Sequence, residues 1–265
     1  MDLGLKNKVA IVTGVASKKG VGRAIALALA QEGADVALAD ISFEGVESLA
    51  EEIRSLGRRV LPLRVDQGVF AEVQKAVVGI LQELGTVDIL VNNAAITNNV
   101  VSTKKMTPAA WEREISVNLN GIFYWVHEVL PVMGRKNWGR IINISSTGGM
   151  VGAAGLPSYC ASKGGLLAFT KTVALEVGKS GITVNAVSLG VINTEIYTRG
   201  VLEPAMVEAM RSSVPLGRMG EPWEAAQLVA FLASEGAAYI HGANIVIDGG
   251  VTLGISKATH VSRKI

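Results

Sequence analysis

A tyrosine and a lysine four residues apart are the residues whose types and spacing best suit chemistry. They are Tyr159 and Lys163, and Ser146 lies 13 residues before the tyrosine. In a helix, residues four apart lie one turn above each other on the same face. A phenol has a reference pKa of about 10, which makes it a poor acid or base near neutral pH. A neighbouring ammonium favours the phenolate and therefore lowers the pKa of the tyrosine.

A serine hydroxyl that holds a carbonyl oxygen would complete a proton-transfer device. Beside a bound dinucleotide, Ser146, Tyr159 and Lys163 would suit alcohol oxidation or ketone reduction. Taken alone, Ser146 could be a plain serine at the end of a strand, and Lys163 could be a surface lysine. The elements around them must therefore place them together.

Apolar runs bounded by turns alternate with helix-like stretches along the chain. The expected strands are 8–13, 35–40, 59–65, 87–92, 140–145, 183–188 and 243–247. The expected helices are 22–31, 43–56, 69–84, 108–134 with a break near 117–120, 157–178 and 224–233. Strands that are apolar on both faces and separated by helices predict an α/β fold. We expect one domain over residues 1–265, with a doubly wound, seven-stranded parallel sheet covered by helices on both faces.

The stretch 190–219 lies between the sixth strand and the next core helix and is irregular, with an amphipathic piece at 202–211. A long excursion at the carboxyl end of a strand predicts a lid over a binding crevice.

Composition excludes several classes of protein. The hydrophobic share of 49% and the charged share of 18% indicate a large core, and a net charge of +2 gives no case for a nucleic-acid or membrane partner. The single cysteine, Cys160, excludes an internal disulfide framework and predicts a cytoplasmic protein. The three histidines lack metal-ligand spacing, so no metal is expected.

A glycine-rich loop follows the first expected strand. Gly14, Gly20, Val21 and Gly22 lie between that strand and a helix, where backbone N–H groups can hold a pyrophosphate. Asp40 ends the second strand, 18 residues after Gly22, and its carboxylate can accept both adenosine ribose hydroxyls while repelling a 2′-phosphate. This favours NAD as the cofactor.

Lys19 favours NADP instead, because a cation in this loop could contact a 2′-phosphate. NADP therefore stays the alternative cofactor. An exposed loop lysine is an equally good explanation of this residue. A desolvated like-charge clash costs more than a mobile lysine gains, and Asp40 therefore decides the expectation.

Taken in order, the motifs resemble the classical short-chain dehydrogenase/reductase family from residue 8 to about residue 250. The resemblance implies a Rossmann fold. The motifs are the 13–22 loop, Asp66, Asn92-Asn93-Ala94-Ala95, Asn118 in Val-Asn-Leu, Ile144-Ser145-Ser146, Tyr159 to Lys163, the 189–194 segment and Asp248-Gly249-Gly250.

The resemblance implies a role for each matched residue. Tyr159 is similar to the general acid/base, Ser146 would orient the substrate oxygen, and Lys163 would lower the pKa of Tyr159 and bind the nicotinamide ribose. Asn118 would hold a water that links Lys163 to solvent. Cofactor contacts are implied for Gly14, Lys19, Gly20, Val21, Gly22, Asp40, Asp66 (the adenine amino group), Asn92, Ala94, Tyr159, Lys163, Ile192 and Thr194 (the carboxamide).

Three features depart from the family pattern. Five residues separate Gly14 from Gly20 where three are usual, Ala95 replaces a glycine, and Leu189 replaces a proline. The longer loop is similar to that of divergent enoyl-thioester reductases. In those enzymes six residues lie between the tyrosine and the lysine, whereas three lie between Tyr159 and Lys163. The catalytic pair therefore favours carbonyl and alcohol chemistry.

The expected function is hydride transfer between NAD(H) and a secondary alcohol or ketone. One alternative is an NADPH-dependent 3-oxoacyl-thioester reductase, and another is a dinucleotide-binding sensor without catalysis. The resemblance also implies a homotetramer packed through the helices before and after the fifth strand. The sequence does not indicate the substrate.

Overall fold

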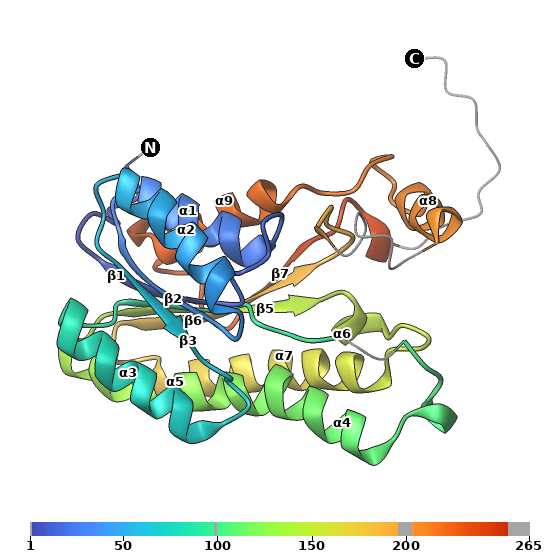
Figure 1. The fold of residues 1–265 in the computed structure, drawn as a ribbon, viewed down its shortest axis with the longest axis horizontal. Helices are drawn as coiled ribbons and strands as arrows, with labels where there is room; N and C mark the ends of the chain where they lie inside the picture. Colours follow the sequence, from blue (N-terminus) through green and yellow to red (C-terminus); the bar gives the residue numbers. More distant parts are fainter. Residues whose placement is uncertain (1, 98–99, 196–202, 254–265) are drawn as a thin grey trace.

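The computed structural model describes residues 2–97, 100–195 and 203–253, and a single parallel sheet forms its centre (Figure 1). Its seven strands stand in the order β3-β2-β1-β4-β5-β6-β7, which confirms the predicted sheet. The strands are β1 (Val9–Thr13), β2 (Asp35–Asp40), β3 (Val60–Arg64), β4 (Ile89–Asn92), β5 (Gly139–Ser146), β6 (Ile182–Leu189) and β7 (Asn244–Ile247).

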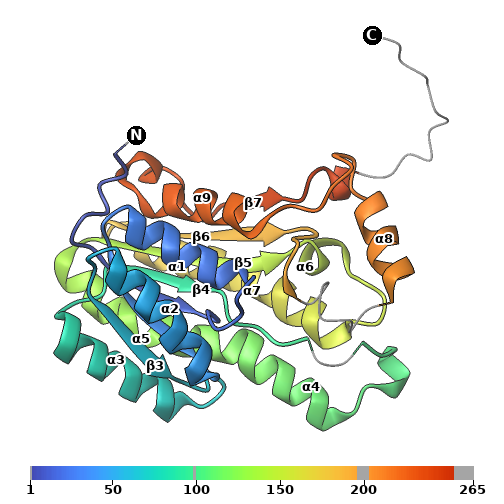
Figure 2. The ribbon, with the colours of Figure 1, turned by 45° about the horizontal axis from the view of Figure 1, so that its top comes forward.

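Helices cover both faces of this sheet. On one face lie α1 (Val21–Gln31), α2 (Phe43–Ser55) and α9 (Pro222–Ala233) (Figures 1 and 2). On the other lie α3 (Phe70–Leu84), α4 (Pro108–Ile115), α5 (Gly121–Lys136) and α7 (Pro157–Val177). Each face has its own apolar core, so the sheet is doubly wound as predicted.

Short elements complete the described chain. They are α6 (Gly148–Val151), α8 (Pro204–Ser212), and the 3₁₀ turns Thr103–Lys105, Glu235–Ala237 and Val251–Leu253. The predicted amphipathic piece at 202–211 corresponds to α8, which lies beyond the carboxyl ends of the strands (Figure 2). Residues 196–202 of the predicted lid lie outside the described residues. Among the described helices, none has the length and apolarity to cross a bilayer.

The two edge strands differ from the expectation of burial on both faces. β1 and β4 are buried throughout, whereas most residues of β3 and β7 are only partly buried. An edge strand has one neighbour instead of two, and this also explains how β3 tolerates Pro62, which donates no ladder hydrogen bond.

The helix expected over 108–134 does not break near 117–120. Between α4 and α5 the chain forms a π-helical turn, Ser116–Asn120, and continues as a helix. Such turns accommodate an extra residue within a helix, and they frequently occur at functional sites. The turn places Asn118 at 0% exposure, facing the protein interior.

The order of the strands creates a crevice between β1 and β4. From β1 the chain moves outward to β2 and β3, and from β4 it moves the other way to β7. At such a switch point the loops that leave neighbouring strands diverge, and ligands of α/β proteins bind there, outside the carboxyl ends.

A row of buried polar side chains ties this sheet to α7. Asn92 donates to Asn143 (2.9 Å), Asn143 donates to the Thr170 hydroxyl (2.9 Å), and Thr170 donates to the Leu166 carbonyl (2.8 Å). All three side chains in the row are at most 1% exposed. Removing one member would therefore leave a buried donor without its partner.

We predict that Thr170→Val lowers the free energy of unfolding by about 1–3 kcal/mol, because the Asn143 amide loses its acceptor. Thr172→Val is the matched control. The Thr172 hydroxyl also bonds to the carbonyl four residues earlier, but it is exposed on the same helix. Urea unfolding of both variants measures the difference, and equal losses would contradict the importance of the buried row.

Candidate active site

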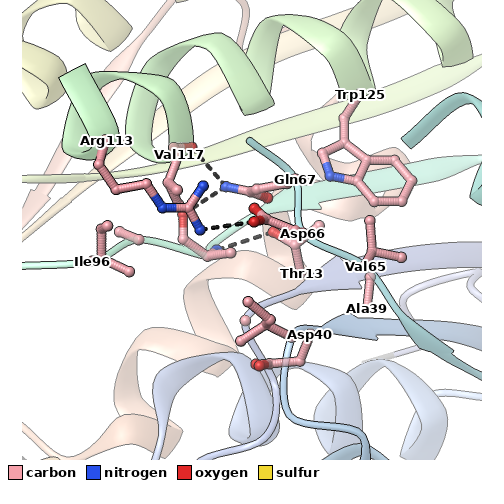
Figure 3. A pocket seen from close by; sticks show the side chains of 14 residues that line it. Thr13, Ala39, Asp40, Val65, Asp66, Gln67, Ile96, Arg113, Val117 and Trp125 are labelled. Atoms are coloured by element: carbon pink, nitrogen blue, oxygen red, sulfur yellow. Dashed lines mark hydrogen bonds and ion pairs between the residues drawn. The ribbon is translucent and has the colours of Figure 1, made fainter. Parts of the chain in front are cut away.

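Two cavities occupy the crevice and share Ala95 in their walls. The smaller, of about 120 Å³, lies at the carboxyl ends of β1, β2 and β3 (Figure 3). The larger, of about 310 Å³, lies at the ends of β5 and β6 and is lined by Ser146, Tyr159 and Lys163. The structure thus brings the three predicted reactive side chains to one cavity.

Helix α7 positions the tyrosine and the lysine. The Lys163 Nζ lies 5.8 Å from the centroid of the Tyr159 ring. The Lys163 side chain is buried, and its Nζ donates to the Ile144 carbonyl at 2.7 Å. The first residues of α7 therefore face the end of β5, with both polar groups on the same side of the helix.

Burial changes the acid–base behaviour of this lysine. Desolvation by burial lowers the pKa of Lys163 to about 8. The side chain is therefore mostly protonated at neutral pH. An ammonium in surroundings of low dielectric constant acts strongly on a neighbouring phenolate.

The two serines at the end of β5 have different roles. The Ser146 hydroxyl accepts a hydrogen bond from the Gly148 N–H (3.1 Å), which leaves its proton able to bond a ligand oxygen. The Ser145 hydroxyl donates to the Lys163 carbonyl (3.0 Å) and fixes α7 on the strand. The choice of Ser146 from its spacing to Tyr159 stays a prediction.

The side chain of Asn118 forms two hydrogen bonds with the backbone of Ile96. Its Oδ1 accepts from the Ile96 N–H and its Nδ2 donates to the Ile96 carbonyl, both at 2.8 Å. This paired contact fixes the segment after β4 against the π-helical turn. The side-chain amide has one acceptor site and one N–H beyond these two bonds, and the backbone carbonyl of Asn118 is a further group that could hold a water.

The glycine-rich loop forms an open N-terminus beside the crevice. Gly14 has a φ of +72°, and a Cβ there would lie 2.6 Å from the Cα of Ala94, so only glycine fits. Gly20 precedes α1 without a side-chain cap, and the first turn, which includes Gly22, has no acidic residue. Such a helix start suits a phosphate. Val21 lines the larger cavity.

Lys19 contributes its backbone rather than its side chain to the described contacts. Its N–H donates to Oε1 of Glu195 at 3.3 Å, and its side chain lines neither of the two cavities. Glu195 belongs to the segment after β6, so the loop contacts the start of the predicted lid.

Two carboxylates line the smaller cavity, as Figure 3 shows. Asp40 accepts from the N–H groups of Ala16 and Ser42, both at 3.0 Å. A carboxylate has about four lone-pair sites, so two stay available for ribose hydroxyls. Asp66 accepts from the Gly68 N–H (2.9 Å) and from the Arg113 guanidinium (2.8 Å).

The structure does not bring the side chain of Asn92, a predicted cofactor contact, to the crevice. Asn92 is fully buried, and its side chain bonds to Asn143 inside the sheet. Ala94 lines the smaller cavity, and Ile192 and Thr194 line the larger one. In the Asn92-Asn93-Ala94-Ala95 motif, the last three residues line the two cavities and Asn92 does not.

Sequence reasoning missed three side chains of the smaller cavity. Gln67 donates to the carbonyls of Ala94 and Val117, Arg113 reaches Asp66 from α4, and the Trp125 ring closes the inner end (Figure 3). The position of Gln67 directly after Asp66 was the one available signal. Arg113 lies on α4 and Trp125 on α5, both in the connection between β4 and β5, and neither belongs to a recognisable local motif.

Among the described residues, no group of three or more His, Cys, Asp or Glu side chains could hold a metal ion.

Known proteins share this arrangement. A family model described as Enoyl-(Acyl carrier protein) reductase matches residues 14–252. The chain is 40% identical to the 3-oxoacyl-[acyl-carrier-protein] reductase FabG of Thermotoga maritima, covering 94% of this chain and 99% of the relative. It is 35% identical to the cyclohexanol dehydrogenase of Acinetobacter sp. strain SE19, covering 93% and 95%.

A solved structure agrees with these matches. A Sinorhizobium meliloti 1021 protein described as a short-chain alcohol dehydrogenase superposes with a TM-score of 0.89 at 34% identity, covering 94% of this chain and 98% of that one. With the seven-stranded sheet, the glycine-rich loop and the Ser146, Tyr159 and Lys163 cavity, this shows that the chain belongs to the short-chain dehydrogenase/reductase family of NAD(P)-dependent oxidoreductases.

Proposed function

We propose that this protein transfers a hydride between NAD(H) and a secondary alcohol or ketone, with Tyr159 as the general acid/base. The observation that carries the proposal is the shared cavity of Ser146, Tyr159 and the buried Lys163. When bound, the nicotinamide supplies or accepts the hydride. The protein contributes the placement of the substrate and the movement of its proton.

Each residue of the cavity has a defined task. The Ser146 hydroxyl bonds the substrate oxygen and orients the carbinol carbon. Tyr159 takes the alcohol proton during oxidation and returns it during reduction. The Lys163 ammonium stabilises the phenolate, and its Nζ also suits the nicotinamide ribose. Asn118 would hold a relay water, through its backbone carbonyl or the remaining sites of its side-chain amide.

The crevice fits an extended dinucleotide. Gly14, Gly20 and Gly22 offer the open helix N-terminus to the pyrophosphate, Asp40 and Asp66 lie at the adenosine end, and Ile192 and Thr194 lie at the nicotinamide end. Val21 and Ala94 complete the proposed contacts, and the Lys19 N–H would have to exchange its bond to Glu195 for one to the cofactor.

The charges near Asp40 favour NAD over NADP. Beside Asp40 lies a recess lined by Lys18 and Arg23, where a 2′-phosphate would find cations. The recess also contains Glu44 and Glu195, so two carboxylates offset the two cations. Asp40 itself, held by two backbone N–H groups, faces the ribose position as a fixed negative charge.

A 3-oxoacyl-thioester reductase using NADPH is the second candidate, favoured by the 40% identity to FabG of Thermotoga maritima. It needs the same catalytic groups, because carbonyl reduction and alcohol oxidation are one reaction in opposite directions. Assays with acyl thioesters and with cyclic or linear alcohols, each with NAD(H) and NADP(H), separate the two.

We infer that the single domain assembles as a homotetramer through α5 and α7. Phe123 on α5 is 47% exposed and Leu175 on α7 is 88% exposed. The Phe123 ring also contacts Tyr124 and Phe169, at centroid distances of 5.8 and 6.3 Å. This aromatic surface is costly to leave in water. The lone Cys160 supports a reducing, cytoplasmic location.

Tyr159→Phe is expected to lower kcat by about 10²–10⁴-fold, because the phenyl ring cannot exchange the proton. The affinity for NADH, measured by fluorescence titration, should stay unchanged. Tyr239→Phe, at a fully exposed tyrosine, is the control. Wild-type protein that binds NADH but turns over no alcohol, ketone or thioester would contradict the proposal and favour a redox sensor.

Asp40→Asn should lower the ratio of kcat/KM for NAD to that for NADP by at least about tenfold, or 1.4 kcal/mol. Asparagine keeps an acceptor for the Ala16 N–H but removes the charge that opposes a 2′-phosphate. Asp40→Ala should change the ratio similarly while also loosening the loop. Glu51→Gln, at an exposed carboxylate of α2, controls for net charge. A wild type that already prefers NADP would overturn the NAD assignment.

Phe123→Lys combined with Leu175→Lys should shift the sedimentation coefficient from that of a tetramer to that of a smaller species. Two buried ammonium groups would have to be desolvated in the assembled form. Leu56→Lys, at a 43% exposed residue after α2, should leave the assembly unchanged. A wild type that sediments as a monomer would refute the proposed assembly.

A further inference from the structure

A buried carboxylate lies near the catalytic helix and has no part in the mechanism described above. Glu114 on α4 is 2% exposed, and it is the buried residue of that helix. Charged side chains are seldom buried this deeply unless a specific contact compensates the loss of water. An apolar residue would fill the same place at lower cost, so the carboxylate requires an explanation.

Glu114 contacts the first turn of α7. The Ser158 hydroxyl donates a hydrogen bond to Oε2 of Glu114, and Ser158 itself is 0% exposed. Ser158 is the second residue of α7. A negative charge at this end of a helix is stabilised by the helix dipole.

The start of α7 lacks the usual local support. Leu156, the residue before the helix, makes no side-chain cap bond, and Pro157 at the first position has no N–H. Gly152 and Gly155, just before, have φ values of +76° and +83°. Both values lie in the left-handed region that glycine favours, and backbone bonds from Val101 to Gly155 and from Leu156 to Ala153 hold this connection. Glu114, from another helix, holds this turn through the Ser158 side chain instead of capping its backbone N–H groups.

Tyr159 depends on this first turn, whereas Lys163 does not. Tyr159 is the third residue of α7, in the turn where helices fray. Lys163 lies one turn deeper and has two anchors on β5, through its Nζ to Ile144 and its carbonyl to Ser145. The distance between the two groups therefore depends on two contacts: β5 fixes the position of Lys163, and α4 fixes the helical turn that carries Tyr159.

The residue before Glu114 serves the other end of the crevice. Arg113 pairs with Asp66 at 2.8 Å, and adjacent residues of a helix point about 100° apart. Helix α4 is itself anchored by Thr107, whose hydroxyl accepts from the Ala110 N–H. One short, capped helix thus contacts both the adenosine end and the catalytic helix.

We propose that Glu114 is a positioning residue for the reaction, which holds the first turn of α7 through Ser158 and so keeps Tyr159 directed at the substrate oxygen. This inference rests on the proposed role of Tyr159. It assigns Glu114 no contact with substrate or cofactor.

The test compares Glu114→Leu, Glu114→Gln and Ser158→Ala. Leucine has a similar size but accepts no hydrogen bond, whereas glutamine keeps an acceptor for Ser158. We expect Glu114→Leu and Ser158→Ala to lower kcat by about tenfold or more with the NADH dissociation constant unchanged, and Glu114→Gln to retain most of kcat. Glu112→Gln, at an exposed carboxylate of the same helix, should be silent.

A second readout separates positioning from general stability. Amide hydrogen exchange of a peptide covering residues 156–162 should be faster in Glu114→Leu than in wild type or Glu114→Gln, with β-sheet peptides unchanged. Unchanged exchange in this peptide, or full kcat in Glu114→Leu, would overturn the proposal. Faster exchange throughout the protein, with parallel loss of NADH binding, would reduce Glu114 to a structural role and also overturn it.

The same measurements distinguish this inference from the proposed function. Equal turnover by wild type and Tyr159→Phe would refute the role of Tyr159, and the positioning role with it, because no general acid/base would then need to be held. Near-complete loss of turnover in Tyr159→Phe together with full kcat in Glu114→Leu would refute the role of Glu114 alone.

Discussion

The burial of the Lys163 ammonium is the constraint on which the arrangement of the active site depends. A charge at 2% exposure is tolerated only where an acceptor meets it, and the Ile144 carbonyl does so at 2.7 Å. That contact requires α7 to lie very close to the end of β5. A Cβ on Gly149 would lie 2.6 Å from the carbonyl carbon of Lys163, so the connection after the strand must be glycine at this point. Desolvation lowers the pKa of Lys163. The same burial holds the ammonium in a fixed position near the Tyr159 ring, where it can stabilise a developing negative charge.

A second close approach, between Gly14 and Ala94, shapes the cofactor crevice. The Thr13 hydroxyl accepts from the Asn93 and Ala94 N–H groups, both at 3.0 Å, which joins the loops after β1 and β4. Asp40 then ties the glycine-rich loop to β2 through the Ala16 N–H. The residue proposed to select NAD therefore also holds the loop that receives the pyrophosphate. Specificity and loop geometry are coupled here, and for this reason a substitution that keeps the acceptor is more informative than alanine.

The sequence allowed the sheet, the helices and the grouping of Ser146, Tyr159 and Lys163 to be predicted, because their signals are local. Strand runs such as 35–40 and the four-residue spacing of Tyr159 and Lys163 can be recognised within a few residues. Contacts set by tertiary packing could not be predicted. Asn92 sits in a strand-end motif, yet a partner 51 residues away turns its side chain into the sheet. Arg113 and Glu114 look like ordinary surface charges in the sequence, and only the position of α4 against Asp66 and Ser158 gives them their contacts.

The walls of the larger cavity bear on the kind of substrate that the site can accept. Among its described lining residues, Lys163 is the one charged side chain, and one of the three N–H donors of its Nζ is bonded to the Ile144 carbonyl. The connection from 147 to 156, which follows Ser146, has no charged residue, and the Val101 N–H bonds to the Gly155 carbonyl, which brings the exposed Val100 against this connection. A substrate carboxylate facing these residues would be desolvated without a partner, at a cost of several kcal/mol. Besides Lys163, the polar side chains of the described lining are Asn93, Thr97, Ser145, Ser146, Tyr159 and Thr194. Among the described residues, this lining is consistent with the proposed uncharged alcohol or ketone substrate, selected by shape apart from its reacting oxygen.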